Sequence, residues 1–181
     1  IVDDAGQDVA DGTPGELLVR RAGDDPRFGF FRAYLKDPDA TDAAWDGGWF
    51  HTGDIVMRDS YGLFFFRDRK KNIIRRSGEN IAALEVETVL MRHAGVAVLA
   101  VGSVPDPLRE QEVACLVVPA PGVDANSLFA ELFALAQEEL AYFKVPGWFA
   151  AVESLPLTGT QKLQRGACLL YTSDAADDLR G

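Results

Sequence analysis

Apolar and polar positions follow different patterns in the two halves of the chain. Up to about residue 67, short apolar runs alternate with clusters of Asp, Gly, Ser and Pro, which is typical of antiparallel strands joined by turns. The expected elements are strands over 16–20, 55–58 and 63–67 and a short helix over 38–45 that Pro38 opens. This part of the chain is therefore predicted to be β-rich.

After residue 71, strands alternate with two amphipathic helices. We expect strands over 72–76, 96–104, 113–119 and 148–152, a glycine turn over 77–80, and helices over about 83–93 and 127–139. In each helix the apolar residues recur at helical spacing and form one face, which indicates packing against a core. This order predicts a compact α+β domain in which two helices cover a small sheet.

The composition is that of a folded protein. Of the 181 residues 48% are hydrophobic, enough to bury the core of one ordinary domain or of two small ones. Disordered, collagen-like and disulfide-dense chains are excluded. No apolar run approaches the roughly 18–20 residues of a membrane span, so we expect no transmembrane segment. The first residue is Ile1 rather than Met, which is expected of a fragment or a processed chain.

The chain is acidic overall but carries one strongly basic segment. A formal net charge of −10 argues against non-specific binding to nucleic acid or to an anionic membrane. Six of the 18 basic residues nevertheless fall within residues 67–76, here named the basic segment: Arg67, Arg69, Lys70, Lys71, Arg75 and Arg76. One alternative for this chain is therefore a non-enzymatic module that binds nucleic acid through the basic segment.

The two cysteines bear on the compartment and on metal binding. Cys115 lies within an apolar run and is expected to be buried, whereas Cys168 lies near the end of the chain. Neither has a histidine or a second cysteine at the spacing of metal ligands, so no metal site is predicted within these residues. This usage of cysteine fits a reducing compartment, and we expect the protein to be cytoplasmic.

Five sequence strings occur in an order that composition does not explain. They are 48–54 (GWFHTGD), 62–74 (GLFFFRDRKKNII), 77–81 (SGENI) followed by 85–87 (EVE), 143–146 (FKVP) and 161–165 (QKLQR). Together they resemble the late motifs of the adenylate-forming enzymes. Within that superfamily they are most similar to acyl-CoA synthetases, especially bacterial ligases of the carnitine-CoA ligase type.

The resemblance implies a two-step reaction. A carboxylate attacks the α-phosphate of Mg-ATP to give an acyl-AMP and pyrophosphate, and the CoA thiol then displaces AMP. The implied cofactors and co-substrates are ATP, Mg²⁺ and CoA, with Mg²⁺ held mainly by an N-terminal region outside these residues. The resemblance also implies that residues 1–67 end a large N-terminal domain, that 68–71 form a hinge, and that 72–167 form a small C-terminal α+β domain.

By this resemblance, three residues of the first half receive roles. Asp54 is the ligand of the nucleotide ribose, because an ionised carboxylate can accept hydrogen bonds from both ribose hydroxyls, and it is expected to follow a tight turn at Thr52 and Gly53. Arg69 meets the same ribose near the domain junction. Lys71 occupies the hinge, where backbone torsions change when the small domain rotates. His51 is interpreted as a packing or turn residue.

Four residues of the second half also receive roles from the resemblance. Lys162 matches the family lysine that reaches the substrate carboxylate and the α-phosphate, where a positioned cation meets the charge that develops on phosphorus. The family usually has a glycine before this lysine, where this chain has Gln161. Gly78 matches the turn that lines the pantetheine path in the second step, and Arg75 and Arg76 are candidates to meet the CoA phosphates.

Both ends of the chain lead to expectations. The family's Ser/Thr/Gly-rich phosphate loop and its Tyr-Gly-x-Thr-Glu segment do not occur in these 181 residues, so we expect the chain alone to be inactive. Residues 168–181 resemble a translated sequencing adapter and are interpreted as a non-native or disordered tail. An adenylation domain of a peptide synthetase is a further alternative. The sequence leaves open which acid is activated and the oligomeric state.

Overall fold

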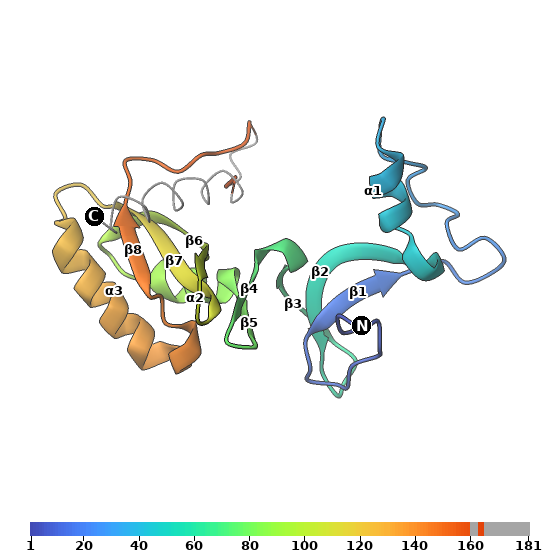
Figure 1. Cartoon of the computed structure of the whole chain (residues 1–181), viewed down its shortest axis with the longest axis horizontal. Coiled ribbons are helices and arrows are strands. Elements are labelled where there is room, and N and C mark those ends of the chain that lie inside the picture. Colours follow the sequence, from blue (N-terminus) through green and yellow to red (C-terminus); the bar gives the residue numbers. More distant parts are fainter. Residues whose placement is uncertain (160–162, 165–181) are drawn as a thin grey trace. The chain divides into compact units, whose positions relative to one another are not determined.

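The chain divides into two compact units, Ile1–Lys71 and Asn72–Gly181, here named unit 1 and unit 2. The structure is a computed structural model that describes residues 1–159, 163 and 164. Two of the predictions, those for Lys162 and for the tail over 168–181, lie outside the described residues. The assignment of 68–71 as a hinge after the end of a large domain stays a prediction. Figure 1 labels the elements of both units.

Unit 1 is built on an antiparallel sheet of three strands in the order β1–β2–β3. These strands are Gly15–Val19, Phe50–Arg58 and Phe64–Arg69. The carboxylate of Asp59 tightens the connection from β2 to β3, because it accepts the backbone N–H groups of Tyr61 and Leu63. The β-rich character predicted for this part of the chain is therefore present in the structure.

An aromatic cluster fixes the long connection between β1 and β2. Helix α1, Pro38–Ala43, begins where the side chain of Asp37 accepts the N–H of Ala40 at 3.0 Å, and the 3-10 turn η1, Asp46–Gly48, follows it. Buried Trp45 lies between these two elements and packs edge-on against Phe30 and tilted against Phe50 of β2. Aromatic rings thus supply the apolar contacts that a short helix alone does not.

Unit 2 is built on a sheet of five strands in which β7 is central. The antiparallel part runs in the order β5–β4–β7–β6, and β8 pairs with β7 in parallel. The strands are β4, Ile73–Arg76; β5, Glu79–Ala82; β6, Val96–Asp106; β7, Glu110–Pro119; and β8, Trp148–Ala151. Because β6 pairs with β7 along its length, β4 and β8 share the other edge of β7.

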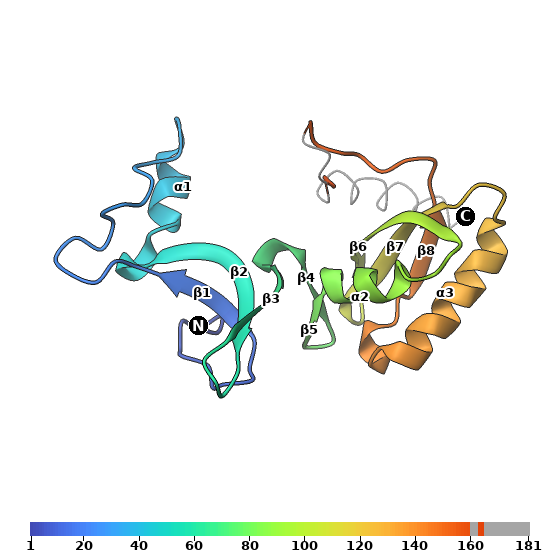
Figure 2. The ribbon, with the colours of Figure 1, turned by 180° about the vertical axis from the view of Figure 1, so that it is seen from behind.

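The two faces of the unit 2 sheet have different covers. One face packs against both helices, α2 (Ala83–Leu90) and α3 (Ala125–Glu139), as Figures 1 and 2 show. The main core lies there and contains Val113, Cys115 and Val117 of β7 together with Leu128 and Leu132 of α3. On the other face, a smaller cluster joins Ala100 and Leu116 to Leu155 and Leu163. Alternate residues of β7 therefore serve two cores.

The predicted fold class, α+β with two helices on a small sheet, is confirmed, and three local predictions differ from the structure. The turn expected over 77–80 is shorter, because Ser77 and Gly78 both have positive φ and form a two-residue hairpin loop from which β5 starts at Glu79. The helix expected to reach residue 93 ends at Leu90, where turn residues lead into β6. The turn expected at Thr52 and Gly53 is instead an irregularity within β2.

We predict that Leu132→Ala strongly destabilises unit 2. The leucine is fully buried between α3 and the sheet, and its truncation would lower the free energy of unfolding by about 2–5 kcal/mol. Phe133→Ala on the same helix is the control, because Phe133 is 42% exposed and its loss would cost well under half as much. Urea unfolding followed by circular dichroism measures both, and equal losses would contradict the assigned core.

Candidate functional site

Asp54 and Arg69, which the sequence assigns to one ribose, face each other on neighbouring strands. They are register partners in the β2–β3 pair, and Arg69 Nε lies 2.9 Å from Asp54 Oδ1. Arg69 also donates from Nη1 to the carbonyl oxygen of Thr52 at 3.1 Å. The antiparallel ladder therefore places a carboxylate and a guanidinium side by side at the end of the hairpin.

The backbone of β2 changes direction directly before Asp54. Glu16 of β1 pairs with Ile55 and Leu18 pairs with His51, so β2 carries extra residues between these two pairs. Gly53 lies within this irregular stretch and has a φ of 68°, a conformation that favours glycine. Thr52 holds it in place, since its hydroxyl donates to Leu17 O at 2.7 Å and accepts the N–H of Asp54 at 3.1 Å.

One oxygen of the Asp54 carboxylate has unused hydrogen-bonding capacity. Oδ1 is buried and accepts no hydrogen bond from the described residues, although Arg69 Nε is close enough to form an ion pair with it. A carboxylate oxygen carries two lone pairs, so Oδ1 can accept a hydroxyl of a ligand beside its ion pair with Arg69. The arrangement is therefore compatible with a ligand that offers a hydroxyl group.

A second carboxylate, Glu16 of β1, lies behind this site. Only 6% of Glu16 is exposed, and its Oε2 accepts a hydrogen bond from Lys70 Nζ at 2.8 Å and lies 3.4 Å from His51 Nδ1. Its Oε1 accepts the backbone N–H of Gly53 at 3.3 Å. Burial raises the pKa of Glu16, but the hydrogen bonds and charges of Lys70 and His51 outweigh it, so the net pKa is lowered. Sequence reasoning missed Glu16, because its partners are distant along the chain.

Gly78, Arg75 and Arg76 lie together on the hairpin of β4 and β5. The hairpin loop is Ser77 and Gly78, and the N–H of Ser77 donates to Arg109 O at 2.9 Å. Arg75 is exposed on β4, and its backbone N–H donates to the side chain of Gln111 at 2.8 Å. The tip of the hairpin is thus fixed to the connection between β6 and β7.

Arg76 is engaged inside unit 2. Its Nη2 lies 2.9 Å from Oε2 of Glu112, whose side chain is 3% exposed, and its Nη1 donates to Phe143 O and Val145 O at 2.7 and 3.1 Å. Arg76 therefore fastens the 143–146 string, which contains part of the 3-10 turn η3 (Tyr142–Lys144), to β4. These internal contacts favour a structural part for Arg76, whereas Arg75 is exposed to solvent.

The remaining predicted residues are less defined by contacts. Lys71 is exposed in the 3-10 turn η2, Lys70–Asn72, which is where the chain passes from unit 1 to unit 2. Lys162 is outside the described residues; Leu163, which is described, forms an isolated bridge with Leu157. The structure thus brings together Asp54 with Arg69, and Gly78 with Arg75 and Arg76.

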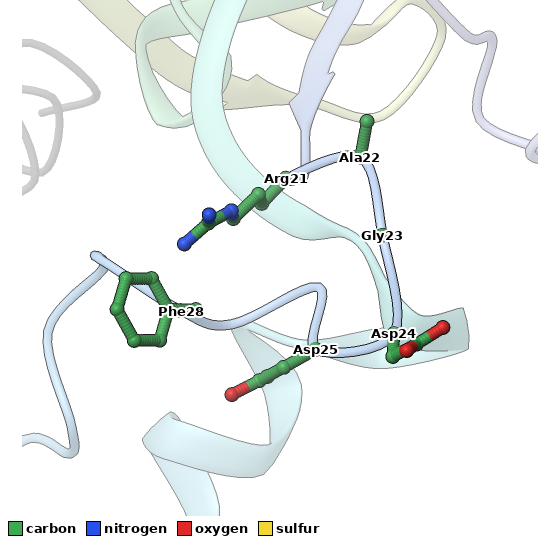
Figure 3. A pocket seen from close by; sticks show the side chains of 6 residues that line it. All are labelled: Arg21, Ala22, Gly23, Asp24, Asp25 and Phe28. Atoms are coloured by element: carbon green, nitrogen blue, oxygen red, sulfur yellow. The ribbon is translucent and has the colours of Figure 1, made fainter.

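A hollow of about 270 Å³ lies in the connection that follows β1. Figure 3 shows the side chains of Arg21 and Phe28 facing each other there, and the guanidinium carbon lies 4.3 Å from the ring centroid. Its lining residues are Arg21, Ala22, Gly23, Asp24, Asp25 and Phe28. None of the residues that the sequence assigns to the reaction is among them.

Several classes of site can be assessed within the part of the chain that the structure describes. There, three or more His, Cys, Asp or Glu side chains nowhere gather in a way that would hold a metal ion. The helices described are all too short or too polar to cross a membrane. Cys115 is buried, as predicted, and burial, with a smaller contribution from the charge of Glu87, raises the pKa of its thiol far above the usual value. That thiol is therefore no nucleophile at neutral pH.

Comparisons with known proteins point in one direction. The protein-family model described as the AMP-binding enzyme C-terminal domain matches residues 85–162. A crotonobetaine/carnitine–CoA ligase of Proteus mirabilis is 37% identical over 158 residues, which are 86% of this chain and 29% of that ligase. The chain thus spans less than a third of the length of this relative.

Solved structures give the same result. An anthranilate CoA ligase in complex with anthranoyl-AMP superimposes with a TM-score of 0.82 at 26% identity, covering 97% of this chain and 33% of that one. An amide bond synthetase of Marinactinospora thermotolerans superimposes with a TM-score of 0.76 at 32% identity, covering 93% of this chain and 33% of that one. The resemblance found in the motifs is thereby confirmed.

We predict that Gly147→Ala destabilises unit 2 by about 1–3 kcal/mol. A Cβ at residue 147 would lie 2.7 Å from Cδ of Glu112, and this carboxylate cannot move aside because Arg76 and Arg109 hold it. Gly159→Ala is the control, since a Cβ there meets nothing within 4 Å. Urea unfolding of both variants decides the matter, and a neutral Gly147→Ala would show that Glu112 is not held.

We predict that Glu16 contributes to stability in a way that is lost in acid. Its pKa is lowered in the folded state, so its contribution is present above the pKa of the unfolded chain and disappears as the pH falls through the folded value. At pH 7, Glu16→Gln would lower the free energy of unfolding by about 2 kcal/mol, and the gap to the parent would close as the pH falls through the lowered pKa of Glu16. Asp11→Asn, which breaks the exposed pair with Arg58, is the control and would change little. A gap that is independent of pH would contradict this assignment.

Proposed function

Because residues 85–162 belong to the AMP-binding enzyme C-terminal domain family, we propose that the chain is the C-terminal part of an ATP-dependent acyl-CoA ligase. The proposed substrates are a carboxylic acid, ATP and CoA. The observation that carries the proposal is the order of the five strings along a chain that matches CoA ligases over 86% of its length. The cytoplasm is the proposed compartment, in keeping with the buried free thiol of Cys115.

The proposed reaction has two steps. A carboxylate oxygen of the acid forms a bond to the α-phosphorus of ATP, and the bond from that phosphorus to the pyrophosphate oxygen breaks. The thiol of CoA then loses its proton and attacks the acyl carbon, and AMP leaves with the electron pair of the broken C–O bond. ATP would enter as its Mg²⁺ complex, but the described residues offer no group of metal ligands, so no step here is assigned to the ion.

Asp54 and Arg69 are proposed to hold the ribose of the nucleotide. The buried Oδ1 of Asp54 forms an ion pair with Arg69 but accepts no well-aligned hydrogen bond from the described residues, and a ribose hydroxyl would supply one. Arg69 lies beside the carboxylate and keeps it oriented. Holding the sugar fixes the adenylate during both steps, which lowers the entropic cost of each.

Lys162 is proposed to act in the first step and the hairpin of β4 and β5 in the second. An ammonium group placed at the α-phosphate stabilises the negative charge that develops there. Gly78, with no side chain and a φ of 83°, lets a pantetheine chain approach the backbone, and the exposed Arg75 is placed on the same hairpin to meet a phosphate. Lys71 is proposed as the hinge that exchanges these groups between the steps.

The match to an amide bond synthetase favours a second candidate, in which an amine rather than a thiol accepts the acyl group. This alternative keeps the adenylate and changes only the nucleophile of the second step. An adenylation domain of a peptide synthetase likewise keeps the adenylate and differs from a CoA ligase in the acceptor. The nucleic-acid alternative loses support, because Arg69, Lys70 and Arg76 of the basic segment pair with carboxylates. Cations neutralised in this way contribute little to phosphate binding.

We predict that Lys162→Ala separates the two steps. Residues 1–181 would be joined to the N-terminal two-thirds of the Proteus mirabilis ligase, and adenylation of carnitine measured by pyrophosphate release. The variant would lose about 10²–10³-fold in adenylation and keep thioester formation from supplied acyl-AMP within about threefold, because the lysine meets only the charge of the first transition state.

Arg92→Ala is the control, since that arginine lies outside the five strings, pairs with Glu139 on the surface and would leave both steps unchanged. The 181-residue chain by itself, which lacks the family's phosphate loop, would release no pyrophosphate. An unchanged first step in Lys162→Ala would remove the lysine from the site. An amine that replaces CoA at equal rate would favour the second candidate over the first.

A further inference from the structure

Glu16 is a buried carboxylate that no step of the proposed reaction uses. Its side chain is 7% exposed, and it receives the ammonium group of Lys70 and the backbone N–H of Gly53 on different oxygens. A carboxylate is rarely buried without a role, because the loss of its hydration must be offset by such partners. The partners of Glu16 belong to two segments of interest: Gly53 precedes the ribose ligand Asp54, and Lys70 precedes the hinge residue Lys71.

The hydrogen bond to Glu16 holds the side chain of Lys70 close to the end of unit 1. Arg69 is the last residue of β3, Lys70 follows it and is held by Glu16, and unit 1 ends with Lys71. In unit 2, β4 begins at Ile73 and pairs with β5 from its first residue. Lys71 and Asn72 are therefore the residues that lie along the chain between Lys70 and the first paired residue of β4.

We propose that Glu16 is a positioning residue that fixes the unit 1 end of the hinge by holding Lys70, and so confines the change of backbone torsion to Lys71 and Asn72. The inference rests on the proposed function for the purpose of the hinge, but the anchor itself is a property of this chain. A hinge works when a few residues absorb the torsion change and the segments on either side stay fixed. Without the anchor, Lys70 would join the moving segment and Arg69 would lose its firm place beside Asp54.

Because the two oxygens of Glu16 have different partners, the contact with Lys70 can be removed while the contact with Gly53 is kept. Glu16→Gln keeps a carbonyl oxygen that can accept the N–H of Gly53, but it removes the charge that holds Lys70. Lys70→Met removes the same contact from the other side, together with a longer ion pair of 3.8 Å to Asp4, and the half-exposed side chain of Lys70 is not needed for the core. Asp11→Asn is the matched control, because it breaks an ion pair of unit 1 between Asp11 and Arg58, neither of which touches Glu16.

Amide hydrogen exchange of the 181-residue chain, resolved by NMR, provides the test. We expect Glu16→Gln and Lys70→Met to speed exchange at residues 70–72 by about tenfold or more, because local opening there would no longer break the ion pair. Amides of β2 that open only with the whole unit report the loss of global stability in each variant, and the effect at residues 70–72 is counted beyond theirs; Asp11→Asn would leave all these amides as in the parent.

Either of two results overturns the proposal: unchanged exchange at residues 70–72 in both variants, or a uniform increase across unit 1. Should Glu16→Gln fail to fold, Lys70→Met decides alone. The measurement needs no ATP, acid or thiol, so its outcome is separate from that of the Lys162→Ala experiment. Faster exchange at residues 70–72 together with unchanged adenylation by the Lys162→Ala enzyme would support the anchor and contradict the proposed function. Unchanged exchange at residues 70–72 together with lost adenylation would contradict only the anchor.

Discussion

Neutralisation of the basic segment by carboxylates is the constraint on which both units depend. Lys70 is held by Glu16, which lies 54 positions earlier in the sequence, and Arg76 is held by Glu112 of β7. Removal of one partner from such a pair would leave a buried charge uncompensated, which costs more than the intact pair contributes. The pair of Arg76 and Glu112 also constrains the segment before β8. Glu112 leaves no space for a side chain at Gly147, and Arg76 donates to the carbonyl oxygens of Phe143 and Val145. In each unit, one buried carboxylate, Glu16 or Glu112, thus pairs with a cation of the basic segment.

The sequence predicted most of the regular structure because the strands and helices carry their own periodicity. Both helices of unit 2 were found from apolar spacing, which tertiary packing then uses directly. Two short features were not found. The loop at Ser77 and Gly78 needs only two residues, and the pattern did not indicate that Glu79 already pairs with Arg76. The irregularity before Asp54 depends on its pairing with β1, and a single strand contains no signal for its partner's register.

The site was predictable only in part, for a related reason. Asp54 and Arg69 were named from motifs, and the register of β2 and β3 places them opposite each other. The motifs assigned Arg76 to a phosphate, whereas its guanidinium contacts Glu112 and two backbone carbonyls. Its partners lie far along the chain, and charge patterns in a sequence do not reveal which distant carboxylate a cation meets. Glu16 was missed for the same reason, since a lone glutamate at the start of a strand has no local signal of burial.

The distribution of contacts has a consequence for the proposed two-step reaction. If one active site is to use Lys162 first and the hairpin loop later, unit 2 must turn while the adenylate stays bound. The grip on the ribose must therefore not depend on unit 2. The side-chain contacts described for Asp54, Arg69 and Glu16 satisfy this requirement, because their partners Thr52, Gly53, His51 and Lys70 all belong to unit 1. The contacts described for Arg76 and Glu112 are likewise with residues of unit 2. A rotation at the hinge would therefore leave these contacts within each unit intact, so the ribose ligands and the hairpin that carries Gly78 would each keep their local geometry through both steps.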